Sequence, residues 1–328
     1  MSKNYKAWVL TDQKTGSNNQ AIALAEEIEI AFKEIKLSYN FLATLPSILL
    51  PKSFLQIQSP DINKLLIEKT PNLIISASRK TALVAAAIKA KRPEIKTIHI
   101  LKPDISFANF DLVIVPQHDK NIANKYKNVF KIIGALNNIK QRLENYPEEL
   151  DKQYGDFISS PFTTILIGGN TKTFSFTKKT AEDFYNKVLN IAEQDNSKFF
   201  ITYSRRTPEI VKEIFNSLGN NGHKIYDPIS SDPNSYPHIM AKSKFVISTC
   251  DSISMLSEIA SIGKPLYIYI PENFHSKKHL AFACQLSDLG IAKIIDQTTN
   301  FLQEYNYTHL SETRKAGEYV LSSILGVK

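Results

Sequence analysis

Short apolar runs alternate with segments of helical periodicity along most of the chain. Short runs of this kind are typical of strands that are buried on both faces of a parallel sheet. Their alternation with helices predicts repeated βαβ units, and therefore an α/β fold. In chain order, the strands predicted from this pattern are 7–10, 73–76, 97–101, 112–115, 164–167, 198–202, 245–248 and 265–270.

The predicted strands form two series, separated by a polar and acidic segment at 137–161 that contains two prolines. A length of 328 residues also suits about two domains. We therefore expect two Rossmann-like domains, at 1–160 and 161–328. The helical spacing at 311–325 predicts a final helix that packs back across either domain.

One pattern occurs in both halves: an apolar strand, then Ser-Arg-(Lys/Arg)-Thr, then a helical segment. The copies begin at Ser78 and Ser204 and contain three of the six arginines, and Thr81 and Thr207 are the expected N-cap residues. A loop between a strand and a helix offers backbone N–H groups and the positive end of the helix to an anion. Arginine there can bind two oxygens at once. The pattern favours phosphate or carboxylate binding over two unrelated loops with solvated charges.

The first predicted strand is followed by a polar loop at 11–19, and a helix is expected at 20–32. Open α/β sheets bind ligands at the carboxyl ends of their strands, so this loop is a candidate site, with an ordinary surface loop as the alternative. It contains neither the G-x-G-x-x-G pattern of dinucleotide sites nor the Walker pattern of ATPases. Its candidate residues are Asp12, Gly16, Asn19 and Gln20.

Two loops of the second half have features of a phosphate or sugar site. Gly168 and Gly169 directly follow a strand, where they allow the backbone to turn tightly and approach a ligand. Thr171, Lys172 and Thr173 add hydroxyl groups and a positive charge. The strand at 245–248 leads into small polar residues and a helix, for which Gly263 is the expected C-terminal cap.

Serines at the start of this last helix leave N–H groups and hydroxyls for a diphosphate, which makes Ser252 and Ser254 candidates. Glu258 lies about two turns into the helix, where a carboxylate can accept hydrogen bonds from a ribose diol. The alternative is a plain βαβ unit in which the serines cap the helix. In the first half, His118 and Asp119 follow a predicted strand and are a candidate general-base pair, because imidazole titrates near neutrality.

Composition argues against several classes of function. Two cysteines are too few for a disulfide framework and indicate reduced thiols in a cytosolic setting. The seven scattered histidines predict no metal site. No apolar run approaches the roughly 18 residues of a transmembrane helix, and the first apolar run is too short for a signal peptide.

The formal net charge is +8, from 40 basic and 32 acidic residues. Since 34 of the basic residues are lysines, we expect no nucleic-acid partner; the surface lysines would suit anionic lipid. The segment at 41–57 is rich in leucine and isoleucine but contains two prolines. It is expected to connect elements over the core, and the alternative is an apolar patch that touches a membrane or a lipid substrate.

Six motifs, in order along almost the whole chain, resemble the Elm-type mitochondrial fission family of alphaproteobacteria and plants. They are W-V-L-T-D-x-x-x-G-x-x-x-Q at 8–20, P-x-H-D at 116–119, G-A-L at 134–136, G-G-x-T-K at 168–172, S-R-R-T-P at 204–208 and D-S-x-S-M-x-S-E at 251–258. The family is similar to GT-B glycosyltransferases, whose two Rossmann-like domains have parallel sheets that face a central cleft. Its plant member is known for recruiting a dynamin-related protein to mitochondria.

The last motif also looks like the donor site of the transferase that makes lipid II, in which a small-residue helix start holds the diphosphate and a glutamate holds the ribose. Here Cys250, Asp251 and Ser252 replace the Arg-Ala-Gly run of that enzyme. The carboxylate of Asp251 would repel a diphosphate unless its charge is paired.

The resemblance implies a donor site in the second domain and an acceptor site, with the catalytic base, in the first. The implied base is His118 or Asp119, and the implied acceptor residues are Asp12, Gly16, Asn19, Gln20 and Arg79. The implied donor residues are Gly168, Gly169, Thr171, Ser204, Arg205, Arg206, Thr207, Asp251, Ser252, Ser254 and Glu258.

We therefore expect a cytoplasmic, metal-independent glycosyltransferase, peripheral to the inner membrane. It would move a sugar from a nucleotide diphosphate sugar to a membrane lipid or envelope-glycan acceptor, and no cofactor is expected beyond that donor. One alternative is a non-catalytic scaffold of the same fold that recruits a protein partner at a membrane. Another is an epimerase that acts on a nucleotide sugar.

Overall fold

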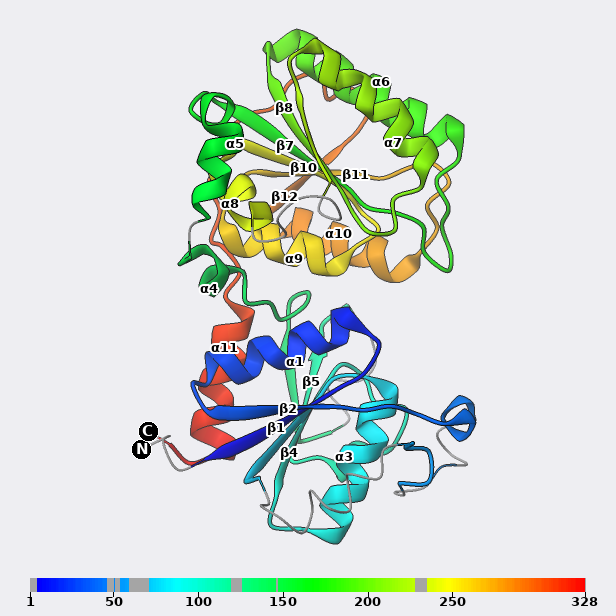
Figure 1. Ribbon diagram of the computed structural model, residues 1–328, viewed down its shortest axis with the longest axis vertical. Helices are drawn as coiled ribbons and strands as arrows, with labels where there is room; N and C mark the ends of the chain where they lie inside the picture. The colour runs from blue at the N-terminus through cyan, green and yellow to red at the C-terminus, as the bar shows by residue number, and fades with distance from the viewer. Residues whose placement is uncertain are drawn as a thin grey trace. The chain divides into compact units, whose positions relative to one another are not determined.

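The structure is a computed structural model that describes residues 5–45, 50, 54–58, 71–118, 126–145, 147–227 and 235–327. The chain forms two compact units, Met1–Asn138 with Ser311–Lys328, and Ile139–Leu310. Each unit contains a six-stranded parallel sheet with helices between its strands (Figure 1). The predicted α/β fold with two Rossmann-like domains is therefore confirmed.

The first sheet has the strand order β2-β1-β3-β4-β5-β6, and all its pairings are parallel. Its strands are β1 (Lys6–Thr11), β2 (Ala31–Lys36), β3 (Leu73–Ser76), β4 (Lys96–Ile100), β5 (Leu112–Pro116) and β6 (Val129–Ile132). Helix α1 (Thr15–Glu27) connects β1 to β2, and α3 (Arg79–Lys91) connects β3 to β4. Short 3-10 turns lie at η2 (Phe41–Thr44) and η4 (Phe107–Asn109).

Alternating side chains of these strands bury both faces of the first sheet. In β1, Ala7 and Val9 pack on the face covered by α1, whereas Trp8 and Leu10 pack on the face covered by α3. Parallel sheets need such cover on both sides, which is why their strands are almost wholly apolar. The first face also receives the C-terminal helix α11 (Glu312–Tyr319) and the π-helical turn η6 (Val320–Ile324).

The second sheet has the strand order β12-β11-β10-β7-β8-β9, again with parallel pairings throughout. Its strands are β7 (Phe162–Ile167), β8 (Lys198–Tyr203), β9 (Lys224–Tyr226), β10 (Phe245–Thr249), β11 (Leu266–Tyr269) and β12 (Ala292–Ile295). Its helices are α4 (Ile139–Leu143), α5 (Glu148–Ile158), α6 (Lys178–Asp195), α7 (Glu209–Asn216), α8 (Ser235–Lys242), α9 (Ile253–Ile262) and α10 (Lys277–Asp288), with a 3-10 turn at η5 (Ser217–Asn221).

Helices α6 and α7 cover one face of this sheet, and α9 and α10 cover the other (Figure 1). Right-handed crossovers give this result, because the chain moves from β7 toward β9 on one side of the sheet and from β10 toward β12 on the other. Gly263 caps α9 with a φ of 89°, as predicted from the sequence.

The two units divide after Asn138, ahead of residue 160, where the sequence suggested a boundary. The reason lies in α5, whose Leu150, Tyr154 and Phe157 share a buried cluster with Phe162 and Phe200 of the second sheet. Helix α4 packs on α8 and α9 of the same unit. The polar segment of the sequence is therefore part of the second core.

The helix predicted at 20–32 is wrong at both ends. Helix α1 begins at Thr15 and ends at Glu27. The backbone then changes direction at Glu29, which adopts a φ of 51°. Residues 31–36 then form β2, an edge strand that pairs with β1. β2 escaped the sequence analysis because five of its six residues are exposed, so it lacks a continuous apolar run.

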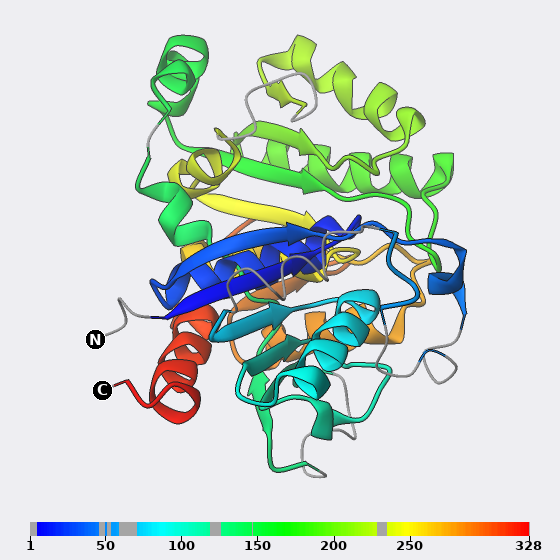
Figure 2. The ribbon, with the colours of Figure 1, turned by 60° about the horizontal axis from the view of Figure 1, so that its bottom comes forward.

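Buried hydrogen bonds attach the C-terminal helix to the first unit. The Glu312 carboxylate accepts the N–H of Ile133 at 2.9 Å, and the Thr313 hydroxyl joins both backbone groups of Asn137. The Tyr5 hydroxyl donates to the carbonyl of Leu325, so the two ends of the described chain lie close together (Figure 2). The first core is thus built from segments at opposite ends of the sequence.

We predict that Glu312→Ala lowers the free energy of unfolding by about 1–3 kcal/mol, because the N–H of Ile133 loses its acceptor. Glu318→Ala is the matched control. Glu318 lies on the same helix and pairs with Arg314, but it is exposed, so its loss should cost about 0.5 kcal/mol or less. Urea denaturation of both variants measures the difference, and equal effects would contradict this role of Glu312.

Candidate functional site

Asp251 is the buried centre of the carboxyl edge of the second sheet. It follows β10, and its carboxylate accepts the N–H of Gly169 at 2.8 Å and the hydroxyl of Thr249 at 2.6 Å. Nη2 of Arg206 lies 3.7 Å from the same carboxylate. These groups partly compensate the negative charge that the sequence analysis found difficult to combine with a diphosphate.

Gly168 and Gly169 are required by close packing within the protein. A Cβ on Gly168 would overlap the Asp251 carboxylate, and a Cβ on Gly169 would overlap the backbone of Arg206 and Thr207. The hydroxyl of Thr207 also donates to the carbonyl of Gly168, at 2.6 Å. The two glycines therefore allow the loops after β7, β8 and β10 to meet.

The two Ser-Arg-(Lys/Arg)-Thr copies share a local geometry. The backbone N–H of the serine donates to the threonine hydroxyl at 2.9 Å in both, from Ser78 to Thr81 and from Ser204 to Thr207. The expectation that the threonines are N-caps is wrong. Ser78 is the N-cap of α3, with Thr81 in a capping box, and Pro208 precedes the first residue of α7.

A pocket of about 420 Å3 lies beside this edge, at the start of α9. Ser252 is the N-cap of α9, and its hydroxyl accepts the N–H of Met255. Arg206 and Lys172 bring positive charge to the pocket, and Asp251 brings negative charge. The residues that line it are Thr171, Lys172, Thr173, Arg206, Asp251, Ser252, Ile253, Ser254 and His279.

His279, in the first turn of α10, also lines this pocket. Its Nδ1 lies 2.7 Å from the hydroxyl of Ser276, and burial lowers the pKa of its ring. His275 and His279 have the four-residue spacing of some metal ligands, which the sequence analysis overlooked. No group of three or more potential metal ligands occurs in the described ranges of the chain.

Glu258 is not among the lining residues of this pocket. Its carboxylate accepts a hydrogen bond from the Tyr236 hydroxyl at 3.1 Å. Burial raises the pKa of Glu258 to about 7, against the opposing effects of Arg142 and Tyr236. The Glu258 side chain thus already has a hydrogen-bond partner within the protein, and its predicted contact with a ribose stays a prediction.

The first unit has a buried aspartate in a comparable place. Asp12 follows β1, and its carboxylate accepts the Ser78 hydroxyl at 2.6 Å and the N–H of Lys14 at 2.7 Å. The Asn18 side chain pairs with both backbone groups of Asp12. Asp12 thus joins the loop after β1 to the start of α3. The Asp12 side chain is buried.

The other predicted acceptor residues differ in exposure. Gly16 and Asn19 are exposed in the first turns of α1, whereas Gln20 is buried and donates to the carbonyl of Gly16. Arg79 donates from its guanidinium to the carbonyls of Ala43 and Leu45. That guanidinium is therefore already engaged by the protein.

His118 is buried just after β5, at the same edge of the first sheet as Asp12. Asp119 lies outside the described residues. The proposed pairing of these two side chains as a general base stays a prediction.

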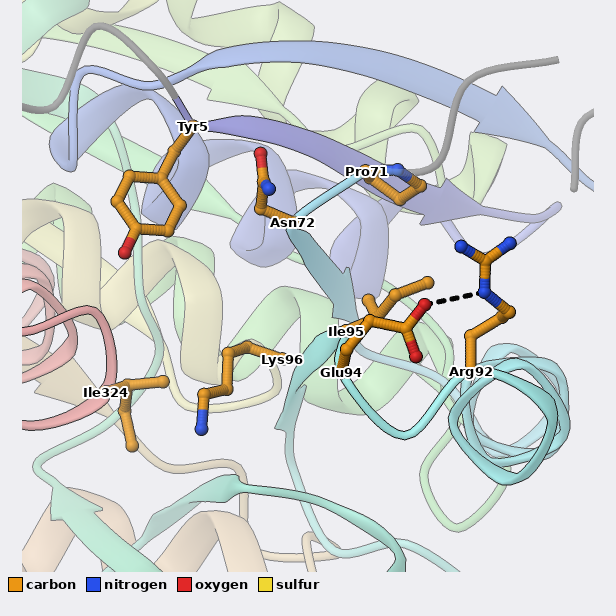
Figure 3. Close-up of a pocket in the computed structure, with 8 residues that line it drawn as sticks. All are labelled: Tyr5, Pro71, Asn72, Arg92, Glu94, Ile95, Lys96 and Ile324. Atoms are coloured by element: carbon orange, nitrogen blue, oxygen red, sulfur yellow. Dashed lines mark hydrogen bonds and ion pairs between the residues drawn. The ribbon is translucent and has the colours of Figure 1, made fainter.

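A second cavity, of about 250 Å3, opens at the opposite edge of the first sheet, where β1, β3 and β4 begin (Figure 3). Tyr5, Asn72 and Lys96 line it, and Arg92 is paired with Glu94 at 2.6 Å. It contains none of the residues predicted for binding or catalysis.

Comparison with known proteins gives the family. Residues 15–324 match the sequence profile of the family described as mitochondrial fission ELM1. The chain belongs to this family. An uncharacterized protein of Rickettsia prowazekii, RP120, is 38% identical over 95% of this chain and 97% of its own length. The mitochondrial fission protein ELM1 of Arabidopsis thaliana is 24% identical over 75% of this chain and 62% of its own length.

Solved structures confirm that the ELM1-family chain has a GT-B-like fold. The UDP-GlcNAc 2-epimerase of Methanocaldococcus jannaschii matches with a TM-score of 0.66 and 13% identity, over 98% of this chain and 99% of its own. UGT71G1 of Medicago truncatula, solved with UDP-glucose, matches with a TM-score of 0.52 and 10% identity, over 98% of this chain and 90% of its own.

The structure gathers only part of the predicted donor set at one pocket. Thr171, Arg206, Asp251, Ser252 and Ser254 line it. Gly168, Gly169 and Thr207 shape the edge beside it, as the hydrogen bonds and close contacts above show. Ser204, Arg205 and Glu258 do not line the pocket, whereas Lys172 and Thr173, which follow Thr171 in the same loop, do. Ile253 is the lining residue that the sequence analysis missed, and its position between Ser252 and Ser254 is the signal that would have found it.

We predict that Gly169→Ala lowers the free energy of unfolding by about 1–3 kcal/mol, since the added methyl group must displace the backbone of Arg206 and Thr207. The control is Gly155→Ala on α5, where the added methyl meets no atom within 4 Å and should stabilise the helix by about 0.5–1 kcal/mol. Urea denaturation separates the two, and a neutral Gly169→Ala would contradict the close packing of this edge.

The raised pKa of Glu258 predicts a pH dependence of stability. The carboxyl group of the folded chain holds its proton up to about pH 7, whereas the unfolded chain loses it near pH 4. The stability linked to this group is therefore complete below pH 4 and is lost as the pH rises to 7. Glu258→Gln should raise the free energy of unfolding by up to about 3 kcal/mol at pH 8, and by much less at pH 5.

Urea denaturation at both pH values tests this expectation. Glu213→Gln, which removes an exposed carboxylate on α7, is the control for the change in net charge. A gain that is equal at pH 5 and pH 8 would contradict the buried carboxyl group as its source.

Proposed function

We propose that this ELM1-family chain binds a nucleotide diphosphate sugar at the pocket beside α9 and transfers its sugar to an acceptor. The observation that carries the proposal is the composition of this pocket. It combines the start of a helix, the Ser252 and Ser254 hydroxyls, and the side chains of Arg206 and Lys172. Helix N-termini and arginine both bind phosphate oxygens. The pocket volume of about 420 Å3 lies in the range of small-molecule sites.

The diphosphate would accept hydrogen bonds from the N–H groups in the first turn of α9 and from Arg206. Asp251 would not oppose it with a full negative charge, because Gly169, Thr249 and Arg206 compensate its carboxylate. As the bond to the sugar breaks, negative charge grows on the departing nucleoside diphosphate. Arg206 and Lys172, which line the pocket, would stabilise that charge.

The acceptor would be activated in the first unit. His118, with Asp119 as the alternative, is our candidate for the base that removes the acceptor proton, because histidine is the side chain that most often serves as a general base. Asp12, Gly16, Asn19, Gln20 and Arg79 are the proposed acceptor residues, and a membrane lipid or envelope glycan is the proposed acceptor class.

We predict that Arg206→Ala weakens the binding of a UDP-sugar by about 10- to 100-fold, as expected for the loss of one charge-assisted hydrogen bond. Arg205→Ala is the matched control. It removes the same charge from the same loop, but from a side chain that does not line the pocket, so binding should change by less than about threefold. Isothermal titration with UDP-GlcNAc and UDP-glucose measures both affinities.

Equal losses for the two variants would contradict the assigned pocket, and no nucleotide sugar binding by the folded wild-type chain would contradict the proposed function. Incubation of the bound donor without an acceptor separates the reaction classes. A transferase leaves the sugar unchanged or hydrolyses it slowly, whereas an epimerase converts it to its epimer. Binding without any turnover across acceptors would favour the scaffold.

A further inference from the structure

Two apolar side chains stand out on the surface of the first unit. Phe41 is 79% exposed and Leu55 is 71% exposed, the highest values among the large apolar residues of the described chain. Leu45, at the end of η2, is 38% exposed. Isolated exposed apolar residues are ordinary, but several that lie close together on the surface indicate an interaction site. We call Phe41, Leu45 and Leu55 the apolar patch.

Two hydrogen bonds of Asn40 bring the segments of Phe41 and Leu55 together. The Asn40 side chain donates to the carbonyl of Leu55 at 2.7 Å, and the Asn40 N–H donates to the carbonyl of Gln56 at 3.1 Å. Tyr39 and Ile57 form an antiparallel bridge beside them. Phe41 and Leu55 therefore extend from two neighbouring backbone segments, although 14 positions separate them in the sequence.

Arg79 holds this segment at the carboxyl edge of the first sheet. Its guanidinium donates to the carbonyls of Ala43 at 2.9 Å and Leu45 at 3.2 Å, within the segment that contains Phe41 and Leu45. Arg79 is the first residue of α3 and follows Ser78, the partner of Asp12. In Figures 1 and 2, the blue segment after β2 extends past the carboxyl end of that strand.

Two lysines of α3 each contact an aromatic ring of the segments that contain the patch. Nζ of Lys80 lies 4.8 Å from the ring centre of Tyr39, and Nζ of Lys91 lies 4.7 Å from that of Phe54. Phe54 is adjacent to Leu55 in the sequence, and Tyr39 lies two residues before Phe41. Lys36 is exposed at the end of β2, and residues 35–58 contain no aspartate or glutamate. Asp104 is the acidic group near Arg79, at 3.9 Å.

We infer that the apolar patch inserts into the surface of an anionic lipid bilayer. Highly exposed apolar side chains close to lysines suit a membrane interface, where acyl chains meet phosphate head groups. The lysines complement a negative lipid surface.

The contact places the carboxyl edge of the first sheet at the lipid surface, because Arg79 joins the patch to the loops around Asp12. Only the idea that this edge would meet a lipid acceptor rests on the proposed function. The membrane contact itself stands apart from donor binding in the second unit.

Vesicle co-sedimentation of the full chain tests the inference, with vesicles of phosphatidylglycerol and phosphatidylcholine against vesicles of phosphatidylcholine alone. The wild-type chain is expected to prefer the anionic vesicles. Phe41→Ser with Leu55→Ser should weaken that binding at least about tenfold, since two large apolar side chains lose their burial in lipid. Lys80→Gln with Lys91→Gln should weaken it about 10- to 30-fold.

Phe301→Ser with Leu289→Ser is the matched control, because it makes the same two changes at exposed residues of the second unit, 53% and 50% accessible. It is expected to bind vesicles like the wild type. The inference is overturned if the wild type does not bind anionic vesicles, if the Phe41 and Leu55 variant binds like the wild type, or if the control loses as much. Titration of UDP-GlcNAc onto the Phe41 and Leu55 variant keeps the two proposals distinguishable, since donor affinity should not change.

Discussion

Each sheet of this protein has a buried aspartate at its carboxyl edge, and the hydrogen bonds to that carboxylate hold the edge together. Asp251 links the loop after β10 to the loop after β7, and Asp12 links the loop after β1 to the start of α3. A buried carboxylate is costly unless donors surround it, so the loops that supply those donors are constrained in position. The candidate binding residues of both units are attached to these loops, which makes the two aspartates the structural base of both candidate sites.

The central strands were predictable from the sequence because both of their faces are buried. β1, β3, β5, β7 and β10 are mostly apolar and almost wholly buried, and a short apolar run of this kind can be recognised in the sequence. The missed strands β2, β6, β9 and β12 are the edge strands of the two sheets, and β6, β9 and β12 have only three or four residues. One side of such a strand faces solvent or loops, so its sequence is mixed and its conformation depends on the pairing partner.

The candidate site was predictable at the level of loops but not of individual side chains. Strand ends indicated the loops correctly, because parallel strands deliver their carboxyl ends to one edge. Which neighbour faces the pocket depends on backbone details, as Arg205 and Arg206 show. Gly168 and Gly169 suggested a close approach, and the sequence could not tell that the approaching groups are Asp251 and the Arg206 backbone. The burial of Glu258 against Tyr236 likewise arises from the packing of separate helices.

The discontinuous first unit has a consequence for how the chain acquires its structure during synthesis. Residues 139–310 leave the ribosome before α11 does, so the second core can close while the first still exposes the surface that α11 later covers. That surface includes buried apolar residues of α1 and the central strands. The nascent chain must therefore keep an incomplete apolar face free of wrong partners until residues 311–328 emerge, a period in which chaperone protection would matter most.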